Sequence, residues 1–579
     1  MERNEAGRWE VVLIDRRTLL KGLAAIAALP VLAGCSERNG AHASEDAFFS
    51  DHAVLSYRLA VPRGIDPYDA DAAGLAVTYQ LFDQLTRFDY QAGEMRPWAA
   101  ESVVSNDAAT QFTFRLRAGQ TFSTGEALRA ADFKRAWERL VAPGNAVASG
   151  FAATSPWAYL LTLVDGYDEL SNGSASELAG VTCPDVNTLQ VTLKTPYADF
   201  PLLCAHPALS PVPEVALSDS EAFRAKPIGN GPFALHEAWD GTGDIRLTRW
   251  RDAAAPAGAA LLDEAADGEQ VPFDGIAFVL EDDISAAYKQ LEAGNIDVAA
   301  VPVDQLEEAE KTFGPRTEGI VLQGDGHLLS SNTTTVNYLV CNTGEPPFDN
   351  ADVRRALSLA IDRETLCDKV FRGAHAPAAS VVAPCIPVDG TRDWEYAAYD
   401  PDRAKRLLEP LYPAGKDGAR ELEVSLAYSK GGTSAKLIDA LAADFKAVGV
   451  SVKTEAVDWQ DLVRRYRTGD FSCGRMSWTP DAPSLDGVLY PLFRSGIASA
   501  GNYARYANGE TDALLDAARE ATDPAARRSL LSRVAAQVGK DCPVIPLTFV
   551  VQTYATSERV ARLAIDSQGD PYLAGASLA

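Results

Sequence analysis

The segment TSAKLIDALAADFKAVGVSVKTEAV, residues Thr433–Val457, changes its hydrophobic period at a glycine and thereby decides the fold class. Its first half carries apolar residues at helical spacing, which predicts an amphipathic helix with one face turned inward. Gly449 is typical of a residue that ends a helix, and the residues after it alternate as a strand does. The inward stripe consists of Leu437, Leu441, Phe445 and Val448.

Other segments repeat this alternation of helical and strand periods. QFTFRLRAG (111–119) and NTLQVTLKTP (187–196) predict half-buried strands, and DVRRALSLAIDRETLCDKVF (352–371) predicts a helix. The expected buried faces contain Leu189, Val191 and Leu193 in the second strand and Val353, Leu357, Ala360 and Ile361 in the helix. Alternating helices and strands predict an α/β fold. The Ala/Gly/Asp-rich segment 252–270 is interpreted as a surface excursion.

Length and charge limit the classes of function. At 579 residues the chain exceeds what one core organises, so two or three domains are expected. The net charge is −27, and residues 1–34 carry five Lys/Arg against four Asp/Glu, which leaves −28 for the remainder. Such an acidic surface repels phosphates. Binding to nucleic acid, or to anionic lipid through a basic patch, is therefore a poor hypothesis.

The N-terminus contains a targeting pattern, DRRTLLKGLAAIAALPVLAGCSER. Its apolar run, 22–34, is too short to span a bilayer. LAGC resembles the lipobox of bacterial lipoproteins, and Arg16–Arg17 resembles a twin-arginine export motif. We expect a signal peptide at 1–34, a lipidated Cys35, a tether at 35–51, and a lipoprotein on the outer face of the cytoplasmic membrane or in the periplasm. An anchoring helix with a chance cysteine is the alternative, and the export route stays open.

The remaining cysteines and the histidines indicate no metal site. No two cysteines have C-x-x-C spacing and the six histidines are scattered, so zinc and iron–sulfur sites are not expected. An odd number of cysteines leaves at least one thiol free or paired between chains, and the pairing stays open. The seven are Cys183, Cys204, Cys341, Cys367, Cys385, Cys473 and Cys542.

The stretch RMSWTPDAPS, residues 475–484, carries one carboxylate between a Trp and two prolines. An unpaired buried carboxylate costs several kcal/mol, so Asp481 is either solvated or awaits a cation. From the residues alone, a structural role is favoured, in which Asp481 caps a turn or pairs with Arg475. Core packing is the corresponding alternative for Trp459 and Trp478.

Seven segments resemble, in family order, the bacterial extracellular solute-binding protein family 5. Among them are EALRAADFKRAWERL, IGNGPFALHEAW, PPFDNADVRRALSLAIDRETL and VDWQDLVRRYRTGDF, and the match runs from about Ala60 to Phe549. The resemblance implies an α/β fold of the periplasmic-binding-protein type II, with two lobes, three domains and a hinge. The expected domains are 52–90, 214–330 and 546–579 for domain I; 91–213 for domain II; and 331–545 for domain III.

The same resemblance implies the ligand-binding residues. In W-x-x-D, here Trp478 to Asp481, the aspartate pairs with the ammonium of a peptide. The preceding strand offers its backbone, Trp459 and Trp478 flank side-chain pockets, and Arg475 meets the peptide carboxylate. Trp157 is expected to line the opposite lobe. The expected residues are Trp157, Trp459, Arg475, Met476, Ser477, Trp478 and Asp481. Two departures, LTRWRDAAAPAG at 247–258 and Ala482 in the place of an aromatic residue, affect the pocket shape.

The implied function is capture of peptides, most similar to the oligopeptide branch, in a cleft between lobes. An ABC permease with its ATPases would receive the peptide from a monomeric binding protein that has no cofactor, no metal and no nucleic-acid partner. Alternatives are a binder of dipeptides, a nickel chelate or another small solute, and a peptide-sensing lipoprotein. A hydrolase using Asp481 with Glu510 or Asp512 lacks a supporting motif such as G-x-S-x-G or H-E-x-x-H.

Overall fold

The structure is a computed structural model, and it describes residues 2–3, 9–10, 52–89, 94–143, 155–250, 273–318, 320–321, 327–431, 433–497, 501–565 and 569–579. Its contacts divide the chain into two units, Met1–Asp51 and His52–Ala579. In the first unit, β1 (Glu2–Arg3) pairs with β2 (Trp9–Glu10). The rest of the expected signal peptide, Cys35, the tether and the excursion at 252–270 lie outside the described residues.

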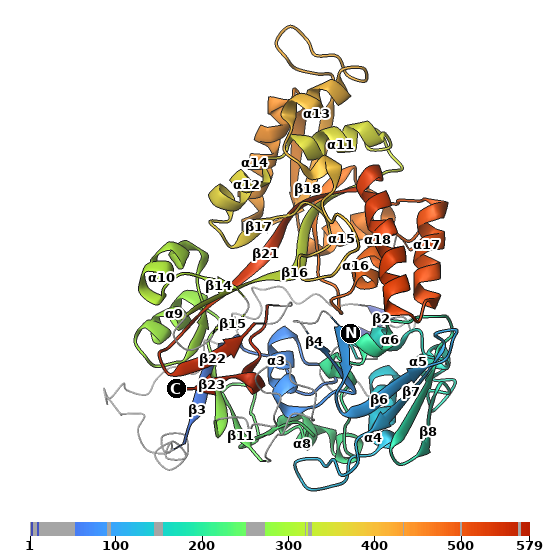
Figure 1. The fold of residues 1–579 in the computed structure, drawn as a ribbon, viewed down its shortest axis with the longest axis vertical. Helices are drawn as coiled ribbons and strands as arrows, with labels where there is room; N and C mark the ends of the chain where they lie inside the picture. The colour runs from blue at the N-terminus through green and yellow to red at the C-terminus, as the bar shows by residue number, and fades with distance from the viewer. Residues whose placement is uncertain are drawn as a thin grey trace. The chain divides into compact units, whose positions relative to one another are not determined.

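A mixed sheet of 12 strands runs through the second unit. Helices lie on both sides of it (Figure 1). Two short strands join beside the main path, where β14 (Thr317–Glu318) pairs with β16 and β17 (His375–Pro377) pairs with β21. In order, the main path is β10 (Phe233–Leu235), β11 (Ile245–Arg249), β12 (Gly275–Leu280), β3 (Val54–Leu59), β13 (Val298–Ala300), β21 (Val544–Thr556), β16 (Leu328–Cys341), β20 (Cys473–Trp478), β18 (Glu423–Ser429) and β19 (Ser451–Val457).

Lobe 1 comprises β3 to β13, β15, α3 to α10, and β22 and β23. A second sheet, in the order β6 (Ala100–Ser105), β7 (Gln111–Leu116), β9 (Thr188–Thr192) and β8 (Val181–Asp185), belongs to this lobe. One buried core, which includes Trp137, continues from this sheet to the main sheet. The smaller strands are β4 (Thr86–Asp89), β5 (Glu94–Pro97), β15 (Ile320–Val321), β22 (Val560–Ala564) and β23 (Ser577–Leu578). The helices are α3 (Ala72–Leu81), α4 (Ala130–Val141), α5 (Tyr167–Ser171), α6 (Phe200–Leu203), α7 (Val215–Ser218), α8 (Ser220–Ala225), α9 (Ile284–Glu292) and α10 (Leu306–Phe313).

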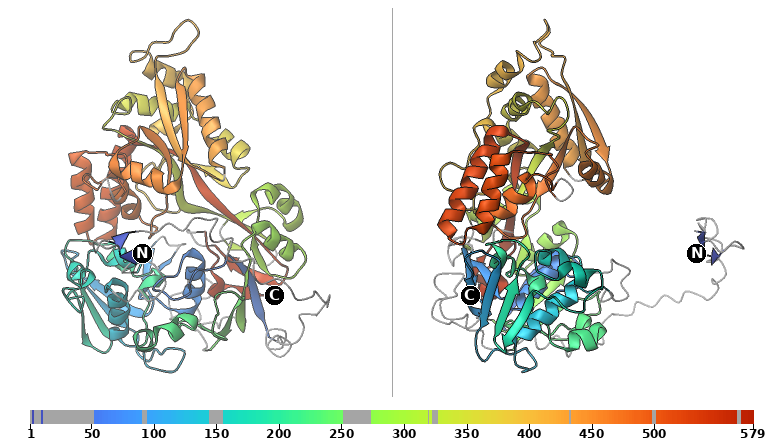
Figure 2. Two further views of the ribbon diagram at one scale, coloured as in Figure 1. Left: turned by 180° about the vertical axis from the view of Figure 1, so that it is seen from behind. Right: turned by 90° about the vertical axis from the view of Figure 1, so that its right-hand side faces the viewer.

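Lobe 2 comprises α11 to α18 and the strands β18, β19 and β20. Its helices cover the sheet and bury two apolar clusters, one around Tyr466 and one around Phe445. The views from behind and from the side show the same separation into two lobes (Figure 2). The helices are α11 (Ala351–Ala360), α12 (Arg363–Thr365), α13 (Pro401–Leu408), α14 (Ser434–Ala447), α15 (Trp459–Thr468), α16 (Leu485–Phe493), α17 (Gly509–Glu520) and α18 (Pro524–Asp541).

The long strands β16 and β21 connect the lobes. Leu329 and Tyr554, which are partners in the register, pack in the core of lobe 1, whereas Val336 and Phe549 pack in lobe 2. Between these ends the register shifts. Asn332 pairs with Val551 and Val336 with Phe549, so four residues along β16 correspond to two along β21. Such a bulge bends a strand pair and locally disrupts its ladder. The two-lobed architecture therefore has an irregular segment where its lobes join.

The expected elements are present with shorter bounds. Helix α14 ends before Gly449, whose φ of 89° suits glycine, and β19 follows it. Strands β7 and β9 lie within their predicted segments. The helix predicted over 352–371 is interrupted, because α11 begins one residue earlier, at Ala351, and ends at Ala360, and α12 follows from Arg363. Every residue of the predicted stripes is buried. The α/β fold class with two lobes is thus confirmed, while the domain boundaries stay predictions. Among the described residues, no helix is both long and apolar enough to cross a membrane.

Candidate ligand-binding site

The loop that carries Asp481 is fixed at both of its ends. Strand β20 stops at Trp478, whose indole N–H donates to the Gly487 carbonyl at 3.0 Å. Helix α16 begins after Ser484, whose hydroxyl accepts from the Gly487 N–H at 3.1 Å and caps the helix. The Thr479 hydroxyl bonds that of Thr335 on β16 at 2.8 Å. The loop therefore presents Asp481 from a defined backbone position.

Asp481 has a neutral partner from the opposite lobe. The Tyr159 hydroxyl of lobe 1 donates to Asp481 Oδ1 at 2.8 Å. No Lys, Arg or His within the described part of the chain forms an ion pair with this carboxylate. Burial raises the pKa of Asp481 above 3.8, and the hydrogen bond from Tyr159 partly opposes this rise. Although solvent reaches the side chain, the protein around it disfavours the ionised form.

Both structural alternatives for Asp481 differ from this arrangement. The Arg475 Nη2 donates to Asn337 Oδ1 at 2.5 Å, so the arginine is directed to β16. The side chain that caps the following helix is that of Ser484. Within the described residues, Asp481 thus has neither a capping role nor a cationic partner.

Tyr159 was missed by the sequence reasoning, which singled out Trp157 in the same SPWAY segment. The Trp157 indole N–H donates to the Ala70 carbonyl at 2.9 Å, and its ring lies 4.6 Å from that of His206. Trp157 is therefore anchored in lobe 1, and Tyr159, 44% exposed, is the residue that extends to lobe 2. A tyrosine has an apolar ring and a polar tip, which was the only available signal.

The lobes also meet beside this loop. The Ala198 N–H donates to the Arg519 carbonyl at 2.9 Å, and Arg527 Nε lies 2.9 Å from Asp199 Oδ1. Ala482, next to Asp481, is buried in a small cluster with Phe88 and Leu202 of lobe 1. In place of the aromatic residue expected from family members, the small Ala482 leaves room for these lobe 1 side chains. Asp481 therefore lies where lobe 1 and lobe 2 come together.

On its second side, strand β20 pairs with another described strand only at its first two residues. It pairs with β16 from Cys473 to Trp478, but with β18 only at Cys473 and Gly474. The Asn342 N–H donates to the Ser472 carbonyl, so residues 474, 476 and 478 bond to β16 and residues 475 and 477 point their backbone groups away from it.

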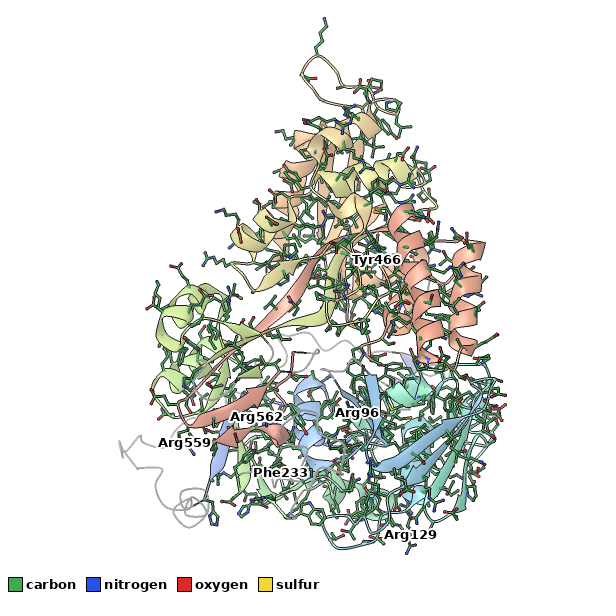
Figure 3. All side chains as sticks on the ribbon, viewed as in Figure 1. Arg96, Arg129, Phe233, Tyr466, Arg559 and Arg562 are labelled. Carbon is green, nitrogen blue, oxygen red and sulfur yellow. The ribbon has the colours of Figure 1, made fainter. Side chains whose placement is uncertain are left out.

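The two outward-pointing residues differ in what their backbone already contacts. The Arg475 carbonyl accepts from the hydroxyl of Tyr466, which Figure 3 labels inside lobe 2. The backbone of Ser477 pairs with no strand on this side among the described residues. The Met476 side chain is buried in the lobe 2 core.

Arg475 begins a row of polar side chains across the sheet. Beyond its bond to Asn337, the Asn337 Nδ2 donates to the Thr548 hydroxyl at 3.4 Å, and that hydroxyl lies 2.7 Å from His375 Nδ1. Burial, followed by the charge of Arg475, lowers the pKa of His375 to about 4, so His375 is neutral at pH 7. Over the described residues Arg475 has no acidic partner, and its Nε is buried without a hydrogen bond.

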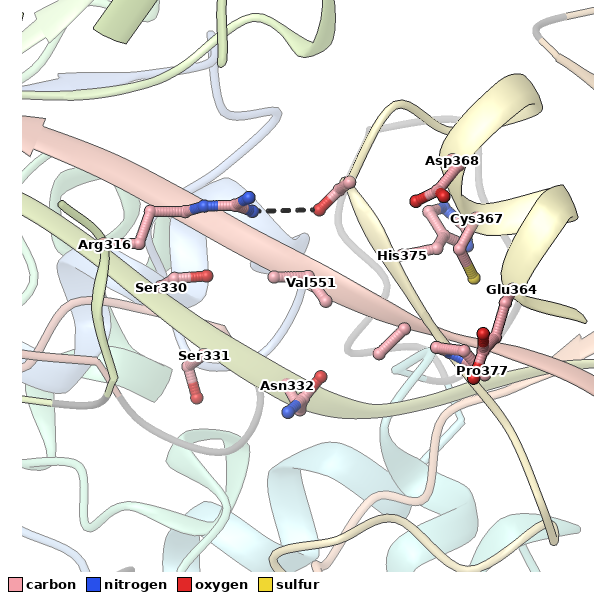
Figure 4. A pocket seen from close by; sticks show the side chains of 12 residues that line it. Arg316, Ser330, Ser331, Asn332, Glu364, Cys367, Asp368, His375, Pro377 and Val551 are labelled. Carbon is pink, nitrogen blue, oxygen red and sulfur yellow. Dashed lines mark hydrogen bonds between the residues drawn. The ribbon is translucent and has the colours of Figure 1, made fainter. Parts of the chain in front are cut away.

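A pocket of about 580 Å³ adjoins this row. Its walls come from the junction strands β16 and β21, from β17, and from the turn near α12, and His375 lines it (Figure 4). Arg316 extends across it and donates to the Gly373 carbonyl at 3.2 Å. Asp481 and Trp478 do not line this pocket. The Asp481 carboxylate and the pocket are therefore separate features. Arg475 is connected to the pocket through the hydrogen-bonded row that ends at His375.

The other expected residues have different surroundings. Trp459 is 51% exposed at the start of α15, so it is not a core residue. Asp512 accepts a hydrogen bond from the Ser495 N–H and forms an ion pair with Arg494, so both of these partners belong to its own lobe. No cluster of His, Cys, Asp and Glu suited to a metal ion occurs among the residues that the structure describes.

Comparison with known proteins supplies the family. The family model described as "Bacterial extracellular solute-binding proteins, family 5 Middle" matches residues 94–500. The oligopeptide-binding protein OppA of Bacillus subtilis is 27% identical over 516 residues, which are 87% of this chain and 89% of the relative. The probable deoxycholate-binding periplasmic protein YgiS of Escherichia coli is 26% identical over 544 residues, 92% and 93% of the two chains.

A solved structure supports the same fold. Haemophilus influenzae OppA in complex with RPPGFSPFR superposes with a TM-score of 0.61 at 24% sequence identity, covering 91% of this chain and 98% of that one. The family model covers more than half of the 579 residues. The chain therefore belongs to the bacterial extracellular solute-binding proteins of family 5.

Proposed function

We propose that this protein is the extracytoplasmic binding component of an ABC importer that captures oligopeptides between its lobes. The observation that carries the proposal is the Asp481 carboxylate, which faces the opposite lobe and, among the residues that the structure describes, has the Tyr159 hydroxyl as its one hydrogen-bond partner. All free peptides share an α-ammonium group, and pairing it with a carboxylate in a water-poor site is a strong, charge-assisted interaction. Asp481 would hold that ammonium without reading side chains.

The backbone and the far end of the peptide have candidate partners on the same strand. The outward-facing N–H and C=O of Ser477 are placed to extend the sheet by one extended peptide, as in strand addition. Arg475 carries a guanidinium that has no acidic partner in the described part of the chain, and a peptide carboxylate would supply one. Trp478 would border the first side chain of the peptide, while Trp157 and Trp459 would line the cleft further from Asp481.

The mode of action follows from the two lobes. An open form admits the peptide, and contacts from both lobes to the same ligand shift the population towards the closed form. The closed form docks on a membrane permease with its ATPases, so the role is stoichiometric and not enzymatic. We further propose that Cys35 carries the lipid that holds the mature, monomeric protein at the outer face of the cytoplasmic membrane.

The relatives do not restrict the ligand to peptides, since a relative named for deoxycholate binding is as similar as the one named for oligopeptides. The charges distinguish these classes. An anionic amphiphile would be attracted to Arg475 and repelled by Asp481, whereas a peptide uses both. Native mass spectrometry of the purified protein should find a ladder of peptide masses, and a single non-peptide mass would contradict the proposal.

The direct test is calorimetric titration with a free peptide and its N-acetylated form. Asp481→Asn should weaken binding of the free peptide by about 10- to 100-fold, because one partner of a charge-assisted bond is lost. Binding of the acetylated form should barely change. The control Asp439→Asn, on the exposed side of α14, should change neither. Equal losses for both peptides on Asp481→Asn would reject the ammonium role.

A further inference from the structure

Two cysteines face each other on neighbouring strands of lobe 2. Cys341 is the last residue of β16 and Cys473 the first of β20, and they are direct partners in the antiparallel register. The Asn342 N–H donates to the Ser472 carbonyl at 2.9 Å, which makes Cys341 and Cys473 a non-hydrogen-bonded pair of the ladder. In such pairs the side chains approach most closely, with Cα atoms about 4.5 Å apart.

The two thiol groups also lie close together. The two Sγ atoms lie 4.0 Å apart, and both residues are buried at 0% and 1% exposure. A disulfide requires Cα atoms roughly 4.4–6.8 Å apart, so the ladder already supplies the backbone separation. Only small side-chain rotations are needed to bring the sulfurs into bonding distance.

We propose that Cys341 and Cys473 form a cross-strand disulfide when the protein folds in the presence of a small-molecule disulfide. One thiol loses its proton, and the thiolate attacks a sulfur of the small disulfide, releasing one small thiol. The other cysteine, as thiolate, then attacks the protein sulfur of the mixed disulfide and releases the second small thiol. The protein thus loses two electrons and two protons, and the small disulfide is reduced to two thiols.

The timing follows from burial. In the folded protein water and solutes do not reach the pair, and burial raises the pKa of the Cys341 thiol, so the thiolate is scarce. Oxidation is therefore expected while the chain folds, before the helices of lobe 2 close over the sheet. Afterwards the same burial protects the bond from reduction.

Cys542 is the rival partner. It lies in the same apolar cluster and within electrostatic reach of Cys341, but its thiol is directed to the Val544 carbonyl at an Sγ–O distance of 3.6 Å. Cys183, which is half-buried, belongs to lobe 1. The register and the direction of the thiols favour the pair Cys341–Cys473 over a bond to Cys542.

The bond would act on the strand that presents the candidate site. Cys473 lies on the same face of β20 as Arg475, two residues further along. A bond between residues 132 positions apart closes a long loop and so restricts the unfolded chain. It would also hold the first residue of β20 against β16, independently of whether peptides are the ligand.

The test is peptide mapping of the wild-type protein. The protein is unfolded under reduction, refolded in a mixture of oxidised and reduced glutathione, alkylated, and digested without reductant. We expect one cross-linked peptide pair containing Cys341 and Cys473, with Cys542 alkylated. Alkylation of both Cys341 and Cys473, or a bond from either to another cysteine, would overturn the proposal.

Variants give a second measurement. Cys542→Ser should retain the cross-link, whereas in Cys473→Ala the thiol of Cys341 should be alkylated. The oxidised wild type should melt several degrees above its reduced form, and this difference should vanish in Cys341→Ala/Cys473→Ala. A melting difference that persists in the double variant would also count against the pair. Because the mapping uses the wild-type chain, a variant that folds poorly does not affect it.

Discussion

Two nearby aspartates, Asp481 in the loop before α16 and Asp486 in α16 itself, have opposite surroundings. Asp486, 2% exposed in the first turn of α16, accepts from Arg519 Nε at 3.0 Å and from Nη2 at 2.8 Å. The Arg519 guanidinium also lies 3.2 Å from the centroid of the Tyr490 ring. Asp481 accepts one hydrogen bond from the neutral hydroxyl of Tyr159.

This difference separates a structural carboxylate from one that is available to a ligand. A buried carboxylate with a two-point arginine partner is satisfied in the protein alone, and removing either group leaves an uncompensated charge. Asp481 has an arginine on the adjacent strand, but Arg475 bonds Asn337 instead. The chain has thus paired the neighbouring aspartate internally and left Asp481 without a cation among the described residues.

The largest expected effect is on stability, in Asp486→Asn. The change leaves the mostly buried guanidinium of Arg519 without its counter-charge, and we expect the free energy of unfolding to fall by ~3 kcal/mol. Urea denaturation monitored by circular dichroism measures this. Asp481→Asn, the same chemical change five residues earlier, should leave the free energy of unfolding of the ligand-free protein undiminished. Similar losses in both variants would make Asp481 structural and remove the contrast.

The next effect is a pH dependence that belongs to Asp481. Because the pKa of Asp481 is raised above 3.8, its protonation begins at a higher pH than for an ordinary aspartate. As the pH falls through this raised pKa, free peptides should bind more weakly, by about tenfold per pH unit once the carboxyl is protonated. The peptide ammonium stays protonated up to a pH of about 8, so affinity should be greatest between these two values.

The control for this pH dependence is Asp481→Asn, in which the low-pH limb should disappear. The contribution of Asp481 to the stability of the ligand-free protein should change with pH in the opposite direction to peptide affinity. A carboxyl group with a raised pKa in the folded state contributes stability when protonated, and this contribution is lost as the pH rises through that pKa. If peptide affinity in the wild type were unchanged down to a pH near 4, Asp481 would not be the ammonium partner.

The sequence predicted the elements better than the contacts between them. The stripe from Leu437 to Val448 and the stop at Gly449 are local patterns, and the structure follows them. The W-x-x-D motif singled out Asp481, but the hydroxyl that contacts it comes from Tyr159, 322 positions away. Hydrophobic period does not encode which residue of a distant lobe reaches a loop. The same holds for the bond from Arg475 to Asn337, which depends on the register of β16 and β20.

Tryptophans illustrate the same limit. Sequence alone left Trp459 and Trp478 between core packing and a ligand pocket, because Trp has both a large apolar ring and an N–H donor. In the structure Trp157 and Trp478 are half-buried with their N–H groups bonded to carbonyls of Ala70 and Gly487, while Trp459 is half-exposed. These outcomes depend on neighbours from other elements.

The smallest expected effect tests the hydrogen bond from the Tyr159 hydroxyl to Asp481. A carboxylate has two oxygens and about four acceptor sites, so Tyr159 and a peptide ammonium can bind it together. Tyr159→Phe removes a bond that lowers the pKa of Asp481, so the low-pH limb of peptide binding should shift to higher pH. At neutral pH we expect affinity to fall by about fivefold, which corresponds to ~1 kcal/mol for one hydrogen bond.

Tyr167→Phe is the matched control, because Tyr167 lies on α5 in the same lobe and keeps its ring beneath Lys194. It should shift neither the pH limb nor the affinity. A gain in affinity on Tyr159→Phe would mean that the hydroxyl competes with the ligand for the carboxylate, so that Tyr159 would be a gate that the peptide displaces. A loss together with the shift in pH dependence would instead make Tyr159 a positioning residue that keeps Asp481 ionised, and would sharpen its contrast with the internally paired Asp486.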